Sequence, residues 1–295
     1  MLLSTQTDVL AQKYGTQEAV RMLARAGFDA YDMSLFRMNR DPDYEFVQDS
    51  WRETAHALRK TADDAGIQCN QAHAPFPSSV GDPEKDEAIF QTIVQAMEIA
   101  SILGAKIIVV HPKQHLQYAG HAHDLPEMTI AFYKRLIPYC QKFGIKVATE
   151  NMWQYAPGTK CIVDSTCASP EEFCAYVDEI GSPWITACLD VGHVVLVNRD
   201  LPGMIRALGH DRLQALHIHD NSLDGDHHTL PYSRSMDFPS MLQALAEIDY
   251  QGDFTFEADC FYKRMPAGLL QAGADFMCTT GRVMMQEIEK YREEV

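Results

Sequence analysis

The sequence predicts an α/β fold and, within that class, a single (β/α)8 barrel that extends over residues 1–295. Two observations lead to this prediction. Short apolar runs rich in β-branched residues alternate with longer amphipathic stretches, and eight such pairs follow one another. Strands that alternate with helices pair in parallel, and eight units of this kind are expected to close into a barrel. With 295 residues, 46% of them hydrophobic, the chain has the length of one such domain.

In the first half of the chain, each predicted helix ends at a glycine, the residue that most easily adopts the left-handed backbone of a helix C-terminus. The sequence Asp82-Pro83-Glu84 marks a helix start, because proline is favoured in the first helical turn. The predicted strands cover residues 1–5, 28–35, 67–74 and 105–110, and the predicted helices cover 16–26, 44–65, 82–103 and 125–143.

In the second half, the helix that begins after Ser169 shows the clearest start signal. The serine hydroxyl can cap the helix, and the acids that follow favour its positive end. Residues 151–169 and 221–236 are rich in polar residues and turn formers, so we expect two long loops there. The predicted strands cover 146–150, 185–189, 213–218 and 253–256, and the remaining helices cover about 201–208, 238–248 and 267–292.

Six successive strands, the third to the eighth, end in an ionisable residue. A single acid at the end of a buried strand is most simply a cap for the next turn. Six such groups at one end of a barrel are costly to bury unless a cation compensates them, and this end carries the active site in barrels of this type. The sequence therefore predicts a metal site made by residues from the set His73, His111, Glu150, Asp190, His217 and Glu257.

Oxygen and imidazole ligands suit one divalent metal ion, Mn²⁺, Mg²⁺ or Zn²⁺, and the absence of thiolate ligands argues against a structural zinc. Beside Glu150, Asp190, His217 and Glu257, the three histidines His73, His111 and His193 could add ligands or bind a substrate. Side chains two positions apart on a strand point the same way, so His219 remains an alternative to His217.

Composition excludes several other classes of protein. The net charge of −16 argues against a nucleic-acid partner, because phosphate binding needs a basic surface. No apolar run is long enough to cross a membrane, and the first residues lack the features of a signal peptide. Eight scattered cysteines without a CxxC pair indicate reduced thiols and a cytoplasmic location. The long last helix is expected to close the barrel, and a homo-oligomer is left open.

Six stretches of the chain, between about residues 67 and 260, match a known pattern in the right order. The chain resembles the sugar phosphate isomerase/epimerase superfamily, the xylose isomerase-like TIM barrels to which endonuclease IV is related. The matching stretches are His73-Ala74-Pro75, Val109-Val110-His111-Pro112, Glu150-Asn151, Leu189-Asp190-Val191-Gly192-His193, His217-Ile218-His219-Asp220 and Phe256-Glu257.

The resemblance implies that the metal is bound by Glu150, Asp190, His217 and Glu257. It also implies a reaction on a small sugar or cyclic polyol. The metal would bind the carbonyl and neighbouring hydroxyl of a ketose and stabilise a cis-enediolate. Glu150 and Glu257 would be the catalytic bases, one removing the proton and the other returning it. The expected substrate-binding residues are His193, Trp153 and Arg234.

Two relatives supply alternative reactions. An inosose-type dehydratase would use the same proton abstraction to eliminate water. An endonuclease IV-like zinc phosphodiesterase would need three zinc ions, with His73, His111 and His193 as ligands beside a pair from the loop. Asp226 with His227 is the expected pair, and His228 extends this partial match. The acidic charge of the chain makes this last reading the least favoured.

Overall fold

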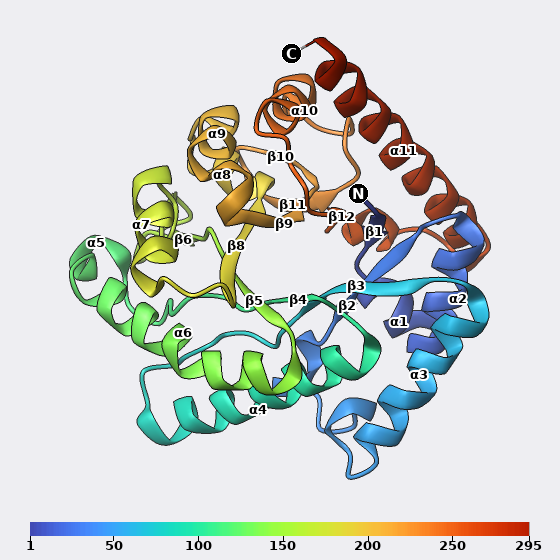
Figure 1. The fold of residues 1–295 in the computed structure, drawn as a ribbon, viewed down its shortest axis with the longest axis horizontal. Helices are drawn as coiled ribbons and strands as arrows, with labels where there is room; N and C mark the ends of the chain where they lie inside the picture. Colours follow the sequence, from blue (N-terminus) through green and yellow to red (C-terminus); the bar gives the residue numbers. More distant parts are fainter. Residues whose placement is uncertain (295) are drawn as a thin grey trace.

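The computed structural model describes residues 1–294 and confirms the barrel (Figure 1). Six parallel strands pair in the order β2-β3-β4-β5-β8-β9, and β1 pairs in parallel with β12. Bridges between Gln6 and Asp32 and between Ile218 and Phe256 join these two groups and close the ring. The barrel strands are β1 (Leu3–Thr5), β2 (Ala30–Ser34), β3 (Gln68–His73), β4 (Ile107–Val109), β5 (Lys146–Glu150), β8 (Ile185–Asp190), β9 (Leu213–His217) and β12 (Phe254–Phe256).

Helices surround this ring of strands, as Figure 1 shows. Gly66 and Gly104 end α3 and α4 with left-handed backbone, at φ of 71° and 94°, which a side chain would strain. The helices are α1 (Asp8–Tyr14), α2 (Thr16–Ala26), α3 (Trp51–Ala65), α4 (Pro83–Leu103), α5 (Tyr118–His121), α6 (Asp124–Phe143), α7 (Pro170–Ile180), α8 (Val191–Leu196), α9 (Leu201–Arg212), α10 (Phe238–Glu247) and α11 (Leu270–Glu294). None of these helices is both long and apolar enough to cross a membrane.

The last helix, α11, lies against α10 and α2 and so covers the place where the first and last strands meet (Figure 1). Its inner face buries Met284 and Ile288 completely, whereas Val283 is half exposed. The expectation that this helix closes the barrel is confirmed.

A small apolar layer fills the barrel beneath the strand ends. Ala148, Cys188 and Ala215 lie two residues before Glu150, Asp190 and His217 on their strands. Because side chains two apart share a face of a strand, this layer and the ionisable residues both point into the barrel. The larger core lies outside, between the strands and the helices, and holds Leu3, Phe46, Tyr133, Phe173 and Phe238 among its fully buried members.

The structure differs from the predicted elements in several places. Both predicted loops contain short antiparallel hairpins, β6 (Trp153–Tyr155) with β7 (Ile162–Asp164) and β10 (Asp220–Ser222) with β11 (Gly225–Thr229). Such strands are too short to show a period in the sequence. The predicted helix over 44–65 is interrupted after a 3₁₀ turn at Glu45–Val47, because Gln48 is extended. Three short helices, α1, α5 and α8, were not predicted.

Candidate metal centre and active site

The carboxyl ends of the barrel strands surround a cavity of about 430 Å³. Asp190 and His217 are fully buried below it, and the other predicted strand-end residues reach its wall. The cavity is lined by Gln6, Asp8, Phe36, Arg40, His73, Phe76, His111, Gln114, Glu150, Met152, Trp153, His193, Asp226, His228, Glu257, Asp259, Cys260 and Lys263.

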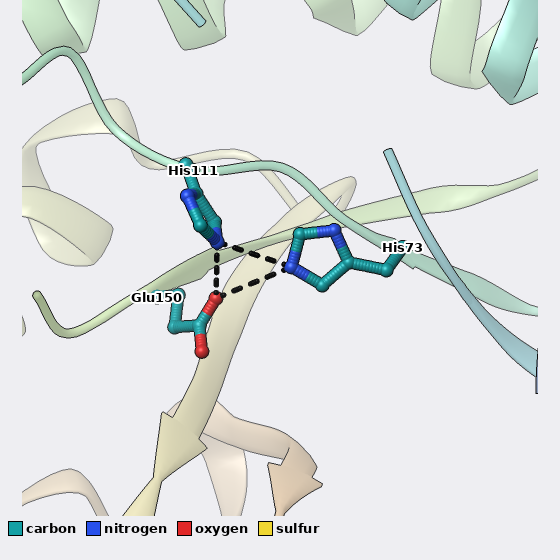
Figure 2. A group of neighbouring side chains, drawn as sticks. All are labelled: His73, His111 and Glu150. Carbon is teal, nitrogen blue, oxygen red and sulfur yellow. Dashed lines mark hydrogen bonds and ion pairs between the residues drawn. The ribbon is translucent and has the colours of Figure 1, made fainter. Parts of the chain in front are cut away.

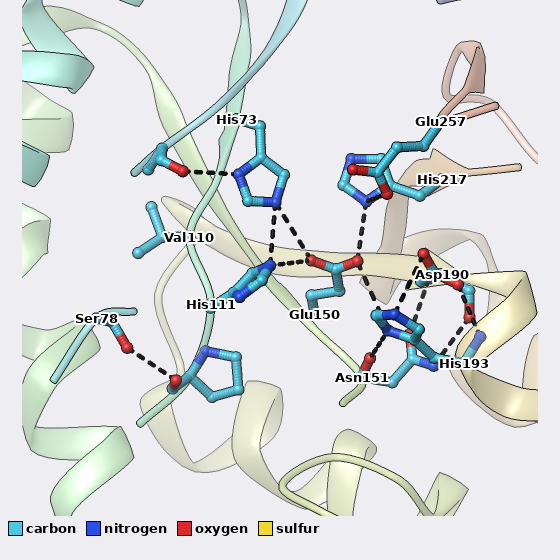
Figure 3. Close-up of polar contacts among 12 residues, drawn as sticks. His73, Ser78, Val110, His111, Glu150, Asn151, Asp190, His193, His217 and Glu257 are labelled. Atoms are coloured by element: carbon cyan, nitrogen blue, oxygen red, sulfur yellow. Dashed lines mark hydrogen bonds and ion pairs between the residues drawn. The ribbon is translucent and has the colours of Figure 1, made fainter. Parts of the chain in front are cut away.

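The four predicted metal ligands form one group. One donor atom from each of Glu150, Asp190, His217 and Glu257 lies within 4.8 Å of the other three. Nδ1 of His217 is 2.9 Å from Oε1 of Glu150 and 3.2 Å from Oε2 of Glu257 (Figure 3). Three buried carboxylates with only imidazoles near them need positive charge, so the donor set fits a divalent cation.

Nearby histidines keep these carboxylates ionised. Burial opposes ionisation of Glu150, but His217 and His111 outweigh it and hold the pKa of this carboxyl well below its usual value. Burial is likewise outweighed at Asp190, whose pKa is lowered by His193 and His219. Both groups are therefore available as anionic ligands at neutral pH.

A second group of donors meets on the other side of Glu150 (Figure 2). Nε2 of His111 is 3.0 Å from Oε2 of Glu150 and 3.1 Å from Nε2 of His73. His73 donates its Nδ1 hydrogen to the carbonyl of Ala74, so the neutral ring presents a lone pair at Nε2. Buried Oε2 of Glu150 has no hydrogen-bond partner among the described residues. Glu150 thus offers one oxygen to each of the two groups.

A third group contains His193, Asp226 and His228. Each histidine donates its Nδ1 hydrogen to a backbone carbonyl, His193 to Asn151 at 2.8 Å and His228 to Glu257 at 3.0 Å. Their Nε2 atoms lie 3.4 and 2.9 Å from Oδ2 of Asp226. Histidines that bind metals usually have this second hydrogen bond, which fixes the ring and its tautomer.

The pairing in the loop differs from the predicted one. Asp226 lies beside His228 and not beside His227, whose Nε2 instead contacts Asp224 at 2.8 Å. The reason is the alternation of side chains along β11, which places positions 226 and 228 on one face and position 227 on the other. His227 belongs to none of the donor groups of residues 1–294, so the structure does not support the additional-ligand role predicted for it.

The structure also separates the two candidate ligands of the seventh barrel strand. His217 belongs to the group of four, whereas Nε2 of His219 contacts both oxygens of Asp190 at 3.0 Å. The ring of His219 stacks on that of His228, with 4.0 Å between centroids. His217 is thus placed as expected, and His219 lies between the group of four and the third group.

Of the two residues expected to contact a substrate from the loops, one reaches the cavity. Trp153 lines it, and its indole Nε1 donates to Asp226 at 3.4 Å. Arg234 is exposed and does not line the cavity, so its predicted substrate contact is not supported. Its backbone N–H donates to Asp220 at 2.6 Å, which ties this part of the loop to the start of β10.

Sequence reasoning missed several residues of the site. Asn151 accepts from the backbone N–H of Asp190 and donates to its carbonyl, which ties β5 to β8 directly below the cavity. The position of Asn151 directly after Glu150 was the signal in the sequence that could have identified it. Asp259 also lines the cavity, and burial with the nearby Asp8 raises its pKa to about 7. Arg40 and Lys263 add the cavity's cationic groups.

Several known proteins are similar in sequence to the chain. The uncharacterized protein MJ1311 of Methanocaldococcus jannaschii is 24% identical over 192 residues, which cover 63% of this chain and 62% of that protein. A putative L-ribulose-5-phosphate 3-epimerase, SgbU, of Escherichia coli is 22% identical over 267 residues, covering 86% and 87%. An L-ribulose 3-epimerase of Methylomonas sp. is 24% identical over 248 residues, covering 83% and 78%.

Solved structures show the same fold. A D-tagatose 3-epimerase-like protein superimposes with a TM-score of 0.74 at 18% identity and covers 100% of this chain and 99% of its own. A D-psicose 3-epimerase superimposes with a TM-score of 0.74 at 14% identity, covering 96% and 99%. The family model of the xylose isomerase-like TIM barrel matches residues 20–280, and the chain therefore belongs to that family.

Proposed function

We propose that this protein is a divalent-metal-dependent sugar isomerase or epimerase that moves a proton next to a ketose carbonyl through a cis-enediolate. The observation that carries the proposal is the meeting of Glu150 and Glu257, from β5 and from the end of β12, at one ring nitrogen of His217. Both acids also line one cavity of about 430 Å³. The relatives named as ribulose epimerases and the psicose epimerase structure support the same class of reaction.

The residues that would hold the cation are Glu150, Asp190, His217 and Glu257. When bound there, a divalent cation supplies Lewis-acid polarisation of the carbonyl and charge for the developing oxyanion. The cation identity, Mn²⁺, Mg²⁺ or Zn²⁺, stays a prediction, because these oxygen and nitrogen donors suit all three.

Side chains of the protein transfer the proton and bind the substrate. Glu150, ionised at neutral pH, takes the proton from the carbon beside the carbonyl, and Glu257 returns it from the other side for epimerisation. His193, whose ring is fixed by the carbonyl of Asn151, faces the cavity and stabilises negative charge on the substrate oxygen. Trp153 and Phe76 give the cavity apolar walls for the carbon skeleton.

Hydrogen exchange tests this function most directly. The protein with added Mn²⁺ is incubated in deuterated water with free ketoses, ketose phosphates and inososes, and each substrate is examined by NMR. We expect deuterium at the carbon beside the carbonyl of one ketose, together with its epimer or aldose. Loss of water from an inosose would instead indicate the dehydratase, and no exchange with any substrate would contradict proton abstraction.

The endonuclease IV-like reaction is a second candidate, and one observation favours it. The two donor groups beside the group of four, made by His73, His111 and Glu150 and by His193, Asp226 and His228, have the residues that the three-zinc reading requires. The net charge of −16 opposes DNA binding. Three zinc ions per chain together with cleavage of abasic DNA would establish this alternative over the epimerase. The cytoplasmic location stays a prediction.

A further inference from the structure

Asp32, in the middle of β2, is a buried carboxylate that the proposed reaction does not use. Its side chain is 1% exposed, and it does not line the cavity. Oδ2 accepts a hydrogen bond from the side-chain amide of Gln71 at 3.0 Å, and Oδ1 has no hydrogen-bond partner among the described residues. Within residues 1–294, the one ion-pair partner of Asp32 is His217, with 3.6 Å between Oδ2 and Nε2. A buried acid with so little compensation calls for an explanation.

His217, in turn, lacks a hydrogen-bond acceptor at its Nε2 atom among residues 1–294. Its Nδ1 faces Glu150 and Glu257, where the cation would bind, and its Nε2 points the opposite way toward Asp32. The ring is completely buried, and Nε2 has no hydrogen-bond partner within normal distance. A neutral imidazole carries one hydrogen. If Nδ1 is to offer its lone pair to a cation, that hydrogen must lie on Nε2 and requires an acceptor.

Two groups adjoin His217, and they differ as acceptors. Cys188 is one, but a thiol sulfur accepts hydrogen bonds only weakly. The other is the carboxylate of Asp32, which Gln71 holds in place. A carboxylate is the stronger acceptor for an imidazole N–H.

We propose that Asp32 is a positioning residue for the metal centre: it accepts the Nε2 hydrogen of His217 and thereby fixes the tautomer that presents Nδ1 to the cation. This inference rests on the proposed metal-dependent function. The 3.6 Å separation is longer than a hydrogen bond, and we expect it to shorten when a cation occupies the other face of the ring. Acceptors of this kind behind a metal-binding histidine typically contribute 10- to 100-fold to metal affinity.

The test compares Asp32→Ala and Asp32→Asn with the control Cys188→Ala, which removes the other neighbour of His217. Each protein is stripped of metal, checked for folding by circular dichroism and titrated with Mn²⁺. We expect Asp32→Ala to weaken Mn²⁺ binding about 10- to 100-fold. Asp32→Asn, which keeps the volume and a weaker acceptor, should fall between this variant and the wild type. Cys188→Ala should stay within about threefold of the wild type, because a thiol is a weak acceptor.

A second measurement reports the tautomer itself. Nitrogen-15 NMR of the histidines in the Zn²⁺-loaded protein should show the His217 hydrogen on Nε2 in the wild type, with the signal assigned by its loss in His217→Gln. In Asp32→Ala this signature should be lost or averaged. Wild-type Mn²⁺ affinity and an unchanged His217 signature in a folded Asp32→Ala protein would overturn the role of Asp32 alone. A wild-type protein that binds no divalent cation would overturn the metal centre itself.

Discussion

The two ends of the barrel carry cavities of nearly equal size, but their chemistry differs. The cavity at the amino ends of the strands measures about 440 Å³ and the one at the carboxyl ends about 430 Å³. At the amino end, Lys146 donates to Gln214 at 2.7 Å, and Asp253 accepts from the amide of Leu2 at 2.8 Å and from Asn70 at 3.1 Å. In each of these hydrogen bonds, a charged side chain pairs with a neutral amide group.

At the carboxyl ends, several carboxylates and histidine rings meet, and Oε2 of Glu150 has only histidine nitrogens near it and no hydrogen bond of normal geometry within residues 1–294. Burial of such a group costs free energy unless a ligand compensates it. The comparison shows that cavity size does not distinguish a functional end of a barrel from a stabilising one. A buried cluster of carboxylates and imidazoles does, because a bound cation would compensate its charges.

The largest effect is expected from the two proposed bases. Glu150→Gln and Glu257→Gln should each lower kcat by about 10³-fold or more, because each change removes both a general base and an anionic ligand. Turnover of the substrate identified by deuterium exchange measures this, and circular dichroism confirms folding. Near-wild-type turnover by either variant would contradict the two-base mechanism.

Metal removal should give the next largest effect. Addition of Mn²⁺ at 100 times its Kd to the stripped protein should raise the free energy of unfolding by about 2.7 kcal/mol, since the cation binds only the folded chain. Thermal unfolding with and without the ion measures the change. The same titration counts the ions bound per chain, with one expected for the epimerase. A stability independent of Mn²⁺ would show that the carboxylates are compensated by protons instead.

A carboxylate at the amino end should show the pH dependence of an ordinary ion pair. Hydrogen bonds from Arg282 lower the pKa of Asp29, against partial burial and with help from the amide of Leu3. The stabilisation is therefore present above the unfolded pKa of about 3.9 and lost as the pH falls through the lower folded pKa. Asp29→Asn should cost about 1 kcal/mol at pH 7, a value reduced by solvent screening of this partly exposed pair.

Urea unfolding of wild type and Asp29→Asn at a series of pH values tests that sign. The difference between the two proteins should shrink below about pH 4, where the wild-type carboxyl becomes protonated. A difference that grows on acidification would mean that Asp29 does not act as an anion toward Arg282.

The smallest effect is expected at the amino-end cavity. Lys146→Met removes one hydrogen bond to Gln214 on a partly exposed side chain, so it should change stability by less than about 0.5 kcal/mol. The turnover rate should stay within about twofold of wild type, because this residue lies at the opposite end of β5 from Glu150. A large loss of turnover in Lys146→Met would contradict the view that only the carboxyl ends of the strands take part in the reaction.

Much of the fold could be predicted from local patterns. The strand over 146–150 and the helix over 16–26 have their expected bounds, because an apolar run or an amphipathic stretch ending at a glycine is a local signal. The hairpins β6-β7 and β10-β11 could not be predicted in this way. Their strands have only three to five residues and are held mainly by pairing with each other. Such pairing leaves no periodic pattern of apolar residues in the sequence.

The sequence by itself determined which strands end in ionisable residues and hence which end of the barrel carries Glu150, Asp190, His217 and Glu257. Only the tertiary structure decided how these atoms share the site. It placed the two oxygens of Glu150 in different donor groups, chose His228 over His227 beside Asp226, and set Asp32 behind His217. The physical reason is range: strand ends follow from local alternation, whereas the direction of each ring nitrogen depends on contacts between residues far apart in the chain.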